Sequence, residues 1–265
     1  MSKSLKELLS LKGKTAVITG GAGYLGTAMS ETLAELGCNL ILASRDGAKC
    51  KKKAEEIAAQ YGSIKAVGLE VDLLKKESIA KFVEQVHENV GAIDILINNA
   101  WSGNKNSWES ISNEDWEYDI NMSLNSVFRL TKAFFEDLKT THGVILNIAS
   151  MYGHIGPDYR IYDGKEFANP PSYGAAKAGV LQFTRYLASF LSPHSIRVNA
   201  LSPGAFPHPP TQKHEVFMQK LGSKNPMNRI GQPDELKGAV ALLCTEAGSY
   251  ITGQNICVDG GWAIW

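Results

Sequence analysis

The chain has 265 residues, enough for one large α/β domain or two small ones, and its 27 basic side chains balance its 27 acidic ones. The neutral charge gives no reason to expect a nucleic acid or a membrane surface as partner, and no apolar run approaches the ~20 residues that span a bilayer. The N-terminus shows no secretory signal and the four cysteines show no C-x-x-C spacing, so we expect a cytoplasmic protein with free thiols and no metal site.

Short apolar runs alternate with longer stretches of helical spacing along the whole chain. The apolar runs predict strands at 14–19, 39–44, 64–72, 93–100, 143–150, 196–204 and 254–261. The helical stretches are 24–37, 47–62, 76–90, 113–139, 172–191 and 233–245. This alternation predicts a single α/β domain over 1–265, with a Rossmann-type doubly wound parallel sheet in a three-layer α/β/α sandwich. In that fold, ligands bind at the carboxyl ends of the strands.

A glycine loop, "TGGAGYLG", follows the first predicted strand and opens the first long helix. Gly20, Gly23 and Gly26 are spaced G-x-x-G-x-x-G, which is close to the dinucleotide fingerprint G-x-G-x-x-G without matching it. Glycines let the backbone approach a pyrophosphate, and the free N–H groups of a helix that begins at about Tyr24 favour anions. The loop therefore predicts a dinucleotide site; the alternative is a turn that needs glycine for its geometry alone.

The end of the second strand, "LILASRD", bears on which dinucleotide binds. A carboxylate at this position binds the ribose hydroxyls of NAD, whereas an arginine suits the 2′-phosphate of NADP. Ser44 ends the strand, Arg45 follows at once, and Asp46 comes late for the ribose. The pattern favours NADP(H), with NAD possible if Arg45 is solvated and Asp46 binds the ribose.

Tyr173 and Lys177 lie at i and i+4 of a predicted helix, so they share one face. A neighbouring ammonium favours the phenolate and lowers the pKa of a tyrosine, which brings it into range for acid–base work. Ser172 is a plausible N-cap, and Ser150 ends a strand where its hydroxyl could bind a substrate oxygen. A Tyr–Lys pair at this spacing is most often an ordinary pair on a helix surface. Here its position along the chain, after the glycine loop and after the strand that ends at Ser150, supports a catalytic role.

Several motifs in this order resemble those of the short-chain dehydrogenase/reductase family, over essentially the whole chain. They are "TGGAGYLG", "VD" (71–72), "NNA" (98–100), "NIAS" (147–150), "YGAAK" (173–177), "IRVNALSPG" (196–204) and "ITGQNICVDGG" (251–261). The resemblance implies hydride transfer between NAD(P)(H) and a hydroxyl or carbonyl carbon, in a homodimer or homotetramer that acts on a small molecule.

The resemblance also implies roles for single residues. Tyr173 would be the general acid/base, Lys177 would lower its pKa and bind the nicotinamide ribose, and Ser150 would orient the substrate oxygen. The implied cofactor-binding residues are Gly20, Gly23, Tyr24, Leu25, Gly26, Ser44, Arg45, Asp72, Leu73, Asn99, Ala100, Tyr173, Lys177, Pro203 and Gly204.

The chain departs from the compact single-domain branch of this family in three short motifs. The glycine spacing resembles the longer branch of sugar-nucleotide epimerases and dehydratases. Trp101 replaces the glycine of "NNAG", and Ser123 stands where the compact branch usually has a structural asparagine. Asn121 and Asn125 lie two residues to either side, about 200° away around a helix, so neither can replace it without a local distortion such as a π-bulge.

A fourth departure is a long segment between Ser150 and Tyr173, with an insertion at about 155–171. Its polar and aromatic composition favours a hydroxylated or anionic substrate; the alternative is a loop for subunit contact. We expect Trp101, Ser150, Tyr152 and Tyr162 to contact substrate under a lid at about 205–228. The aromatic tail with Trp262 and Trp265 suggests a subunit interface.

Together these features predict an NADP(H)-preferring oxidoreductase that interconverts a secondary alcohol and a ketone on a sugar-like substrate. The insertion resembles that of family members from surface-glycan biosynthesis. Two alternatives stay open: a nucleotide-sugar epimerase or dehydratase, and a non-enzymatic sensor of NADP(H).

Overall fold

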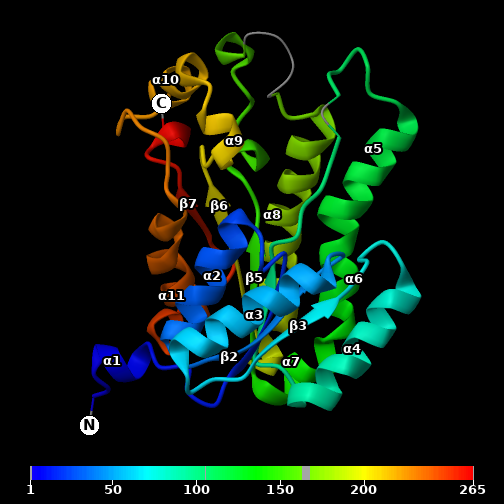
Figure 1. Ribbon diagram of the computed structural model, residues 1–265, viewed down its shortest axis with the longest axis vertical. Helices are drawn as coiled ribbons and strands as arrows, with labels where there is room; N and C mark the ends of the chain where they lie inside the picture. Colours follow the sequence, from blue (N-terminus) through cyan, green and yellow to red (C-terminus); the bar gives the residue numbers. More distant parts are fainter. Residues whose placement is uncertain (1, 105, 163–167, 265) are drawn as a thin grey trace.

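The computed structural model describes residues 2–104, 106–162 and 168–264, and these form one parallel sheet covered by helices on both faces (Figure 1). Strand order along the sheet is β3-β2-β1-β4-β5-β6-β7. The strands are β1 Thr15–Thr19, β2 Asn39–Ser44, β3 Ala66–Glu70, β4 Ile95–Asn98, β5 Val144–Ile148, β6 Arg197–Pro203 and β7 Asn255–Val258. The predicted Rossmann-type sheet is confirmed. Residues 163–167 of the predicted insertion and Trp265 of the predicted interface lie outside the described part.

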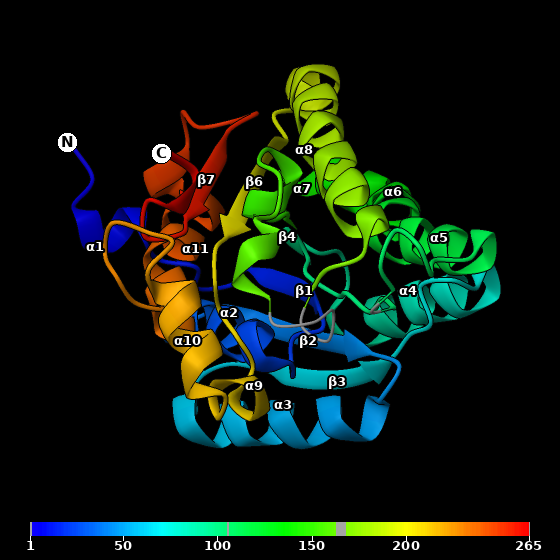
Figure 2. The ribbon, with the colours of Figure 1, turned by 90° about the horizontal axis from the view of Figure 1, so that it is seen from above.

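The helices pack in two layers (Figure 2). On one face lie α2 Tyr24–Glu35, α3 Gly47–Tyr61 and α11 Lys237–Cys244; on the other lie α4 Lys76–Val90, α5 Asn113–Ile120, α6 Ser126–Ala133, α7 Phe135–Thr141 and α8 Pro171–Leu191. Ile18 of β1 packs with the first layer and its neighbour Val17 with the second, and both are fully buried. Because successive strand residues face opposite sides, a sheet covered twice needs unbroken apolar strands, as the sequence has.

The predicted helix over 113–139 is divided into shorter pieces. Between α5 and α6 the backbone forms a π-helical turn, Asn121–Asn125, and Phe134 then separates α6 from α7. A π-turn contains one residue more than an α-turn, so it rotates the side chains that follow. An asparagine at 121 or 125 could replace the one missing at 123 only if the helix were distorted. Such a distortion is present in this helix.

The insertion and the predicted lid pack on one another beyond the carboxyl ends of the strands. The predicted lid segment contains α9 Pro209–Gln212 and α10 Glu215–Gly222. A short 3₁₀ turn at Met151–Gly153 precedes the insertion, and another at Tyr159–Ile161 lies within it. Their shared apolar cluster consists of Met151, Tyr152, Ile161, Phe217, Leu221 and Trp262. Asp158 also pairs with Lys224 at 2.5 Å. The expectation of an exposed Trp262 is wrong, because its side chain completes this cluster and is 5% exposed.

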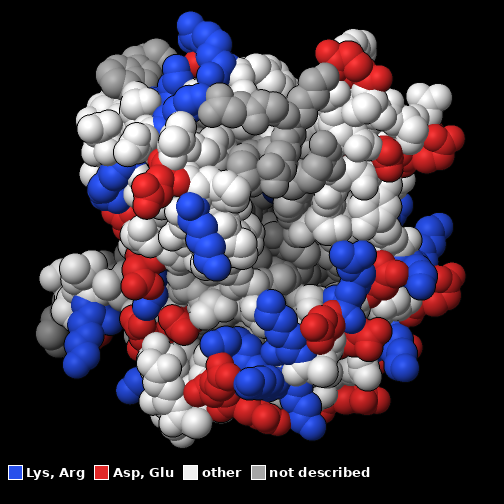
Figure 3. Space-filling view, turned by 45° about the horizontal axis from the view of Figure 1, so that its top comes forward, with Lys and Arg blue, Asp and Glu red and all other residues white. Residues whose placement is uncertain are grey.

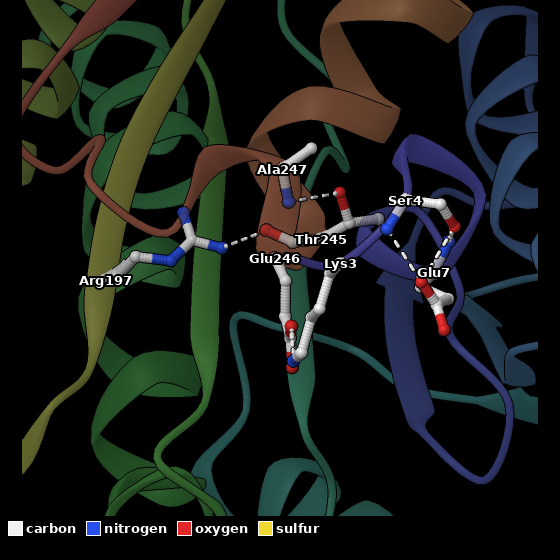
Figure 4. A network of polar contacts seen from close by, with 7 residues as sticks. All are labelled: Lys3, Ser4, Glu7, Arg197, Thr245, Glu246 and Ala247. Atoms are coloured by element: carbon white, nitrogen blue, oxygen red, sulfur yellow. Dashed lines mark hydrogen bonds and ion pairs between the residues drawn. The ribbon is translucent and has the colours of Figure 1, made fainter. Parts of the chain in front are cut away.

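The N-terminal helix α1, Leu5–Leu8, is held against the end of α11 (Figure 4). Ser4 and Glu7 form a capping box, and Lys3 pairs with Glu246 in the turn after α11. Arg197 at the start of β6 donates to the carbonyl of Thr245 at 2.9 Å, which ties this turn to the sheet. No helix of the described residues is long and apolar enough to cross a membrane.

Candidate active site

A cleft of about 390 Å³ opens at the carboxyl ends of β1, β4, β5 and β6. Figure 3 shows this face hollowed near its centre, with charged side chains gathered mostly toward the end that carries α3 and α4. The structure brings most of the predicted site residues to this cleft: Gly20, Gly23, Tyr24, Leu25, Gly26, Asn99, Ala100, Trp101, Ser150, Tyr152, Tyr162, Tyr173, Lys177, Pro203 and Gly204. Ser44, Arg45, Asp72 and Leu73 lie outside its lining.

The glycine loop forms one end of the cleft and is folded tightly on itself. Gly20 has φ +66°, and a Cβ atom on Gly26 would lie 2.0 Å from the carbonyl oxygen of Gly20. The side chain of Asn99 donates to that carbonyl and to the carbonyl of Thr19, at 3.2 and 2.9 Å. Gly23 is the N-cap of α2 and has no side chain to cap it, so the first N–H groups of the helix point toward the loop.

Tyr24 is the first residue of α2, and its side chain reaches the predicted lid segment. Its hydroxyl accepts a hydrogen bond from Gln212 of α9 at 3.1 Å, and its ring lies 5.0 Å from that of His208. Tyr24 therefore joins the glycine loop to the lid segment.

Arg45 and Asp46 after β2 have different partners. The carboxylate of Asp46 accepts from the backbone N–H of Lys49 at 2.9 Å and caps α3. Arg45 donates to the hydroxyls of Tyr118 at 3.3 Å and Ser102 at 3.2 Å. The carboxylate that could have bound the ribose of NAD is thus used by its own helix, while the guanidinium extends toward the segment that follows β4.

Asp72 closes the turn after β3. Its carboxylate accepts from the N–H of Leu74 at 3.1 Å and lies 3.4 Å from the ammonium of Lys75. The next residue, Leu73, is buried in the core beneath this turn. The implied contacts of both residues with the cofactor stay predictions.

Lys177 lies on α8 with its ammonium buried at the centre of the site. Its Nζ donates to the carbonyl of Ile148 at 2.7 Å, and the residue is 5% exposed. Burial lowers the pKa of Lys177 to about 8, because the charged form is desolvated. A chain of buried hydrogen bonds from Asn98 through Asn147 to Thr184 ties β4, β5 and α8 together beneath it, at 2.9 Å for each bond.

Tyr173 precedes Lys177 by one turn, and its ring centroid is 5.8 Å from the ammonium. Burial raises the pKa of Tyr173, and its hydrogen bond with Ser150 works in the opposite direction. The pKa of Tyr173 is therefore raised and not lowered as expected, because desolvation of the phenolate is the largest effect on it. A phenol that keeps its proton is suited to donate it to a carbonyl oxygen.

The predicted N-cap at Ser172 is also wrong. Helix α8 begins at Pro171, whose fixed φ suits the first helical position, and the N-cap is Pro170. Ser172 lies inside the first turn, where its hydroxyl donates to the carboxylate of Asp119 at 2.6 Å.

Ser123 lies in the π-helical turn, 2% exposed, and its hydroxyl has no hydrogen-bond partner among the described residues. The two asparagines beside it bind each other: Asn125 donates to the side-chain oxygen of Asn121 at 2.9 Å, and Arg129 donates to the same oxygen at 3.1 Å. The π-turn therefore brings the two asparagine side chains together, with Arg129 as their shared neighbour.

Aromatic rings form the walls of the substrate end of the cleft. Trp101 meets the ring of Tyr173 edge to face, with centroids 5.3 Å apart. The hydroxyls of Tyr152 and Tyr162 lie 3.1 Å apart, and Tyr162 packs against Phe217 of the lid. The sequence reading missed other lining residues: Met151, Asn169, Phe206, His208, Thr211, Phe217 and Leu221. The lid residues among these fall within the predicted 205–228 segment, but no sequence pattern in that segment identified individual lining residues.

Comparisons with known proteins agree with the fold described above. The family model for enoyl-(acyl carrier protein) reductases matches residues 21–263. The chain belongs to the short-chain dehydrogenase/reductase family. Its curated relatives in this family include the 3-oxoacyl-(acyl-carrier-protein) reductase FabG of Aquifex aeolicus, 36% identical, with 96% of this chain and 98% of the relative covered. Nodulation protein G of Azospirillum brasilense is 33% identical, with 94% and 97% covered.

Solved structures of short-chain dehydrogenases/reductases share the whole fold. RhlG of Pseudomonas aeruginosa, in an NADP active-site complex, superposes with a TM-score of 0.86 at 28% identity, covering 97% of this chain and 98% of that one. A gluconate 5-dehydrogenase from Burkholderia cenocepacia, in complex with NADP and tartrate, gives 0.88 at 25% identity, covering 99% and 100%.

The buried ammonium should make stability depend on pH in a defined direction. Between the pKa of about 8 in the folded enzyme and 10.5 in the unfolded chain, the unfolded chain binds the proton that the folded one releases. The free energy of unfolding should therefore rise with pH in this window, by about 2 kcal/mol between pH 8 and pH 10 relative to Lys177→Met. Urea unfolding of both proteins over this range measures the difference.

The matched control is Lys81→Met, which removes an exposed lysine of α4. The free energy of unfolding of this variant should change with pH in the same way as that of the wild type. A difference between wild type and Lys177→Met that does not change between pH 8 and pH 10 would contradict the burial of the ammonium.

Proposed function

We propose that this short-chain dehydrogenase/reductase uses NADP(H) to interconvert a secondary alcohol and a ketone on a neutral, hydroxylated substrate. The observation that carries the proposal is the meeting of Tyr173, Ser150 and the buried Lys177 in one cleft with the glycine loop. This arrangement supplies a proton donor at one end of the cleft and a site for a dinucleotide at the other.

The residues present fit NADP(H). Gly20 and Gly26 let the loop fold tightly against the uncapped N-terminus of α2, because a Cβ on either would collide with protein atoms. Arg45 offers a planar guanidinium for a 2′-phosphate, and Asp46 is engaged as the cap of α3. The FabG relatives and the NADP complexes among similar structures agree with this assignment. When bound, NADPH supplies the hydride for a carbonyl carbon.

The chain's own residues supply the proton and the orientation. Ser150 donates a hydrogen bond to the substrate oxygen and orients the carbonyl, and the hydroxyl of Tyr173 gives that oxygen its proton. The positive charge of Lys177 stabilises the phenolate that Tyr173 becomes, because an ammonium close to a developing negative charge acts strongly in a dry site. In the reverse direction, Tyr173 removes the proton from the alcohol.

The cleft favours an uncharged substrate with hydroxyl groups. Among its described lining residues, Lys177 is the only lysine, arginine, aspartate or glutamate, which supports an uncharged substrate over an anionic one. The rings of Trp101, Tyr152 and Tyr162 suit the C–H faces of a sugar-like molecule, and the hydroxyls of the two tyrosines suit its oxygens. Surface-glycan synthesis is a reaction context consistent with such a substrate.

A second candidate substrate is a 3-oxoacyl thioester. It is favoured by the FabG relatives, which are between 30% and 36% identical over nearly the whole chain. The epimerase alternative is not favoured, since this chain aligns with these reductases over nearly the whole length of both. The sensor alternative is weakened because Tyr173, Ser150 and Lys177 all line the cleft.

Exposed aromatic rings on α6 and α8 support the homo-oligomer that the family resemblance implies. Phe128, Tyr186 and Phe190 are each more than half exposed, and Phe183, Tyr186 and Phe190 stack in a row along α8. An apolar row of this kind fits burial against a second copy.

The reaction is tested by NADPH oxidation on a panel of neutral ketoses, hydroxyketones, keto acids and a 3-oxoacyl thioester. We expect turnover on a neutral hydroxylated ketone and a loss of at least about 10³-fold in kcat for Tyr173→Phe, because the proton donor is removed while the ring stays. The matched control, Tyr159→Phe, changes an exposed tyrosine of the insertion. Turnover confined to the thioester would select the second substrate class, and full activity in Tyr173→Phe would contradict the assignment of the acid.

Cofactor preference is tested by Arg45→Ala. Because charged hydrogen bonds to a phosphate are lost, the Kd for NADPH should rise about 10- to 100-fold, while the Kd for NADH should change less than about twofold. Fluorescence titration with both cofactors measures this, with Lys49→Ala as a control for the general loss of a nearby cation. An equal increase in the Kd for NADPH and for NADH would show that Arg45 does not bind the 2′-phosphate.

A further inference from the structure

Asp119 of α5 is a buried carboxylate beside the catalytic helix. It is 1% exposed, and within the described part of the chain no lysine, arginine or histidine forms an ion pair with it. Burying a carboxylate costs free energy unless hydrogen bonds satisfy it. The hydrogen bonds that satisfy Asp119 therefore identify what it holds in place.

Those hydrogen bonds join two separate segments of the cleft wall. One carboxylate oxygen of Asp119 accepts from the hydroxyl of Ser172 at 2.6 Å, and Ser172 is fully buried and directly precedes Tyr173. The other oxygen accepts from the backbone N–H of Asn104 at 3.0 Å and from its side chain at 3.4 Å. A single side chain thus binds the first turn of α8 and the segment that follows β4.

The segment bound through Asn104 carries the wall of the substrate pocket. Trp101 lies three residues before Asn104, and its ring meets that of Tyr173 at an interplanar angle of 78°. Gly103 lies between them: a Cβ there would be 3.0 Å from the Trp101 ring and 3.1 Å from the carboxylate of Asp119. The glycine lets the segment pass between the indole and the carboxylate, so the place of the Trp101 ring depends on Asp119.

We propose that Asp119 is a positioning residue that fixes the Trp101 wall against the acid Tyr173 and so sets how a substrate carbonyl meets the phenol. This inference rests on the proposed function of the site. Asp119 acts through Ser172 and Asn104, and it touches neither the reacting atoms nor the glycine loop.

The chain offers a matched control on the same helix. Asp115 lies one turn before Asp119, and its carboxylate accepts from the side chain of Asn106 at 2.5 Å. It contacts the same loop region through Asn106, whereas the hydroxyl of Ser172 bonds to Asp119. Asp115→Asn therefore removes a carboxylate from α5 and leaves the bond to the catalytic helix in place.

The kinetic test compares Asp119→Asn, Ser172→Ala, the double variant and Asp115→Asn. An amide has one acceptor oxygen and cannot serve both segments as the carboxylate does. We expect Asp119→Asn to lower kcat/KM for the ketone at least about tenfold, mainly through kcat, since misplacement by an ångström is costly to a positioned reaction. The Kd for NADPH should stay within about twofold. Ser172→Ala should act in the same direction, and the double variant should be no worse than Asp119→Asn, because both act on one bond.

A second measurement needs neither substrate nor cofactor. Backbone amide exchange, followed by NMR, should accelerate at Asn104 and Tyr173 in Asp119→Asn and stay at the wild-type rate in Asp115→Asn. Wild-type exchange at both amides in Asp119→Asn would overturn the inference whatever the kinetics. Faster exchange with unchanged kcat and KM would also overturn it, because the contact would then be structural alone. If the wild type turns over no ketone but amide exchange responds as expected, the proposed function is wrong. The link that Asp119 makes between the two segments would still be supported.

Discussion

The site depends first on one close approach of backbone to backbone. The α-carbon of Gly26 comes so near the carbonyl oxygen of Gly20 that a methyl group would lie 2.0 Å from it. This approach brings the N-terminus of α2 against the end of β1, and Asn99 binds the same carbonyl from the end of β4. From β1 the chain continues to β2 on one side of the sheet, and from β4 it continues to β5 on the other side. The cleft therefore opens between β1 and β4.

The sequence predicted the features that local chemistry determines. Unbroken apolar strands such as that around Val17 and Ile18 require a sheet covered on both faces, and the structure has one. The i, i+4 spacing of Tyr173 and Lys177 places both side chains on one face of α8, and both line the cleft. Rotation around a helix showed that an asparagine two residues from Ser123 could replace the missing one only with a local distortion; whether such a distortion exists could be learned only from the structure, which has a π-helical turn there.

Features that depend on distant contacts could not be predicted from the sequence. The raised pKa of Tyr173 follows from burial by other segments, which disfavours the phenolate. Trp262 looked like an exposed tail residue, but the insertion and lid provide a cluster that covers it. Asp119 gave no signal either, because its partners lie 15 and 53 residues away and meet only in the folded chain.

The account is tested most directly by NADPH binding to Gly26→Ala. Wild type should bind NADPH saturably in a fluorescence titration, and Gly26→Ala should weaken binding at least about 100-fold, because the methyl group pushes α2 from the loop. Gly238→Ala, where the structure has no atom within 4 Å of the new methyl, is the control and should bind like wild type. If folded Gly26→Ala binds NADPH within about twofold of wild type, the glycine loop is not the phosphate site.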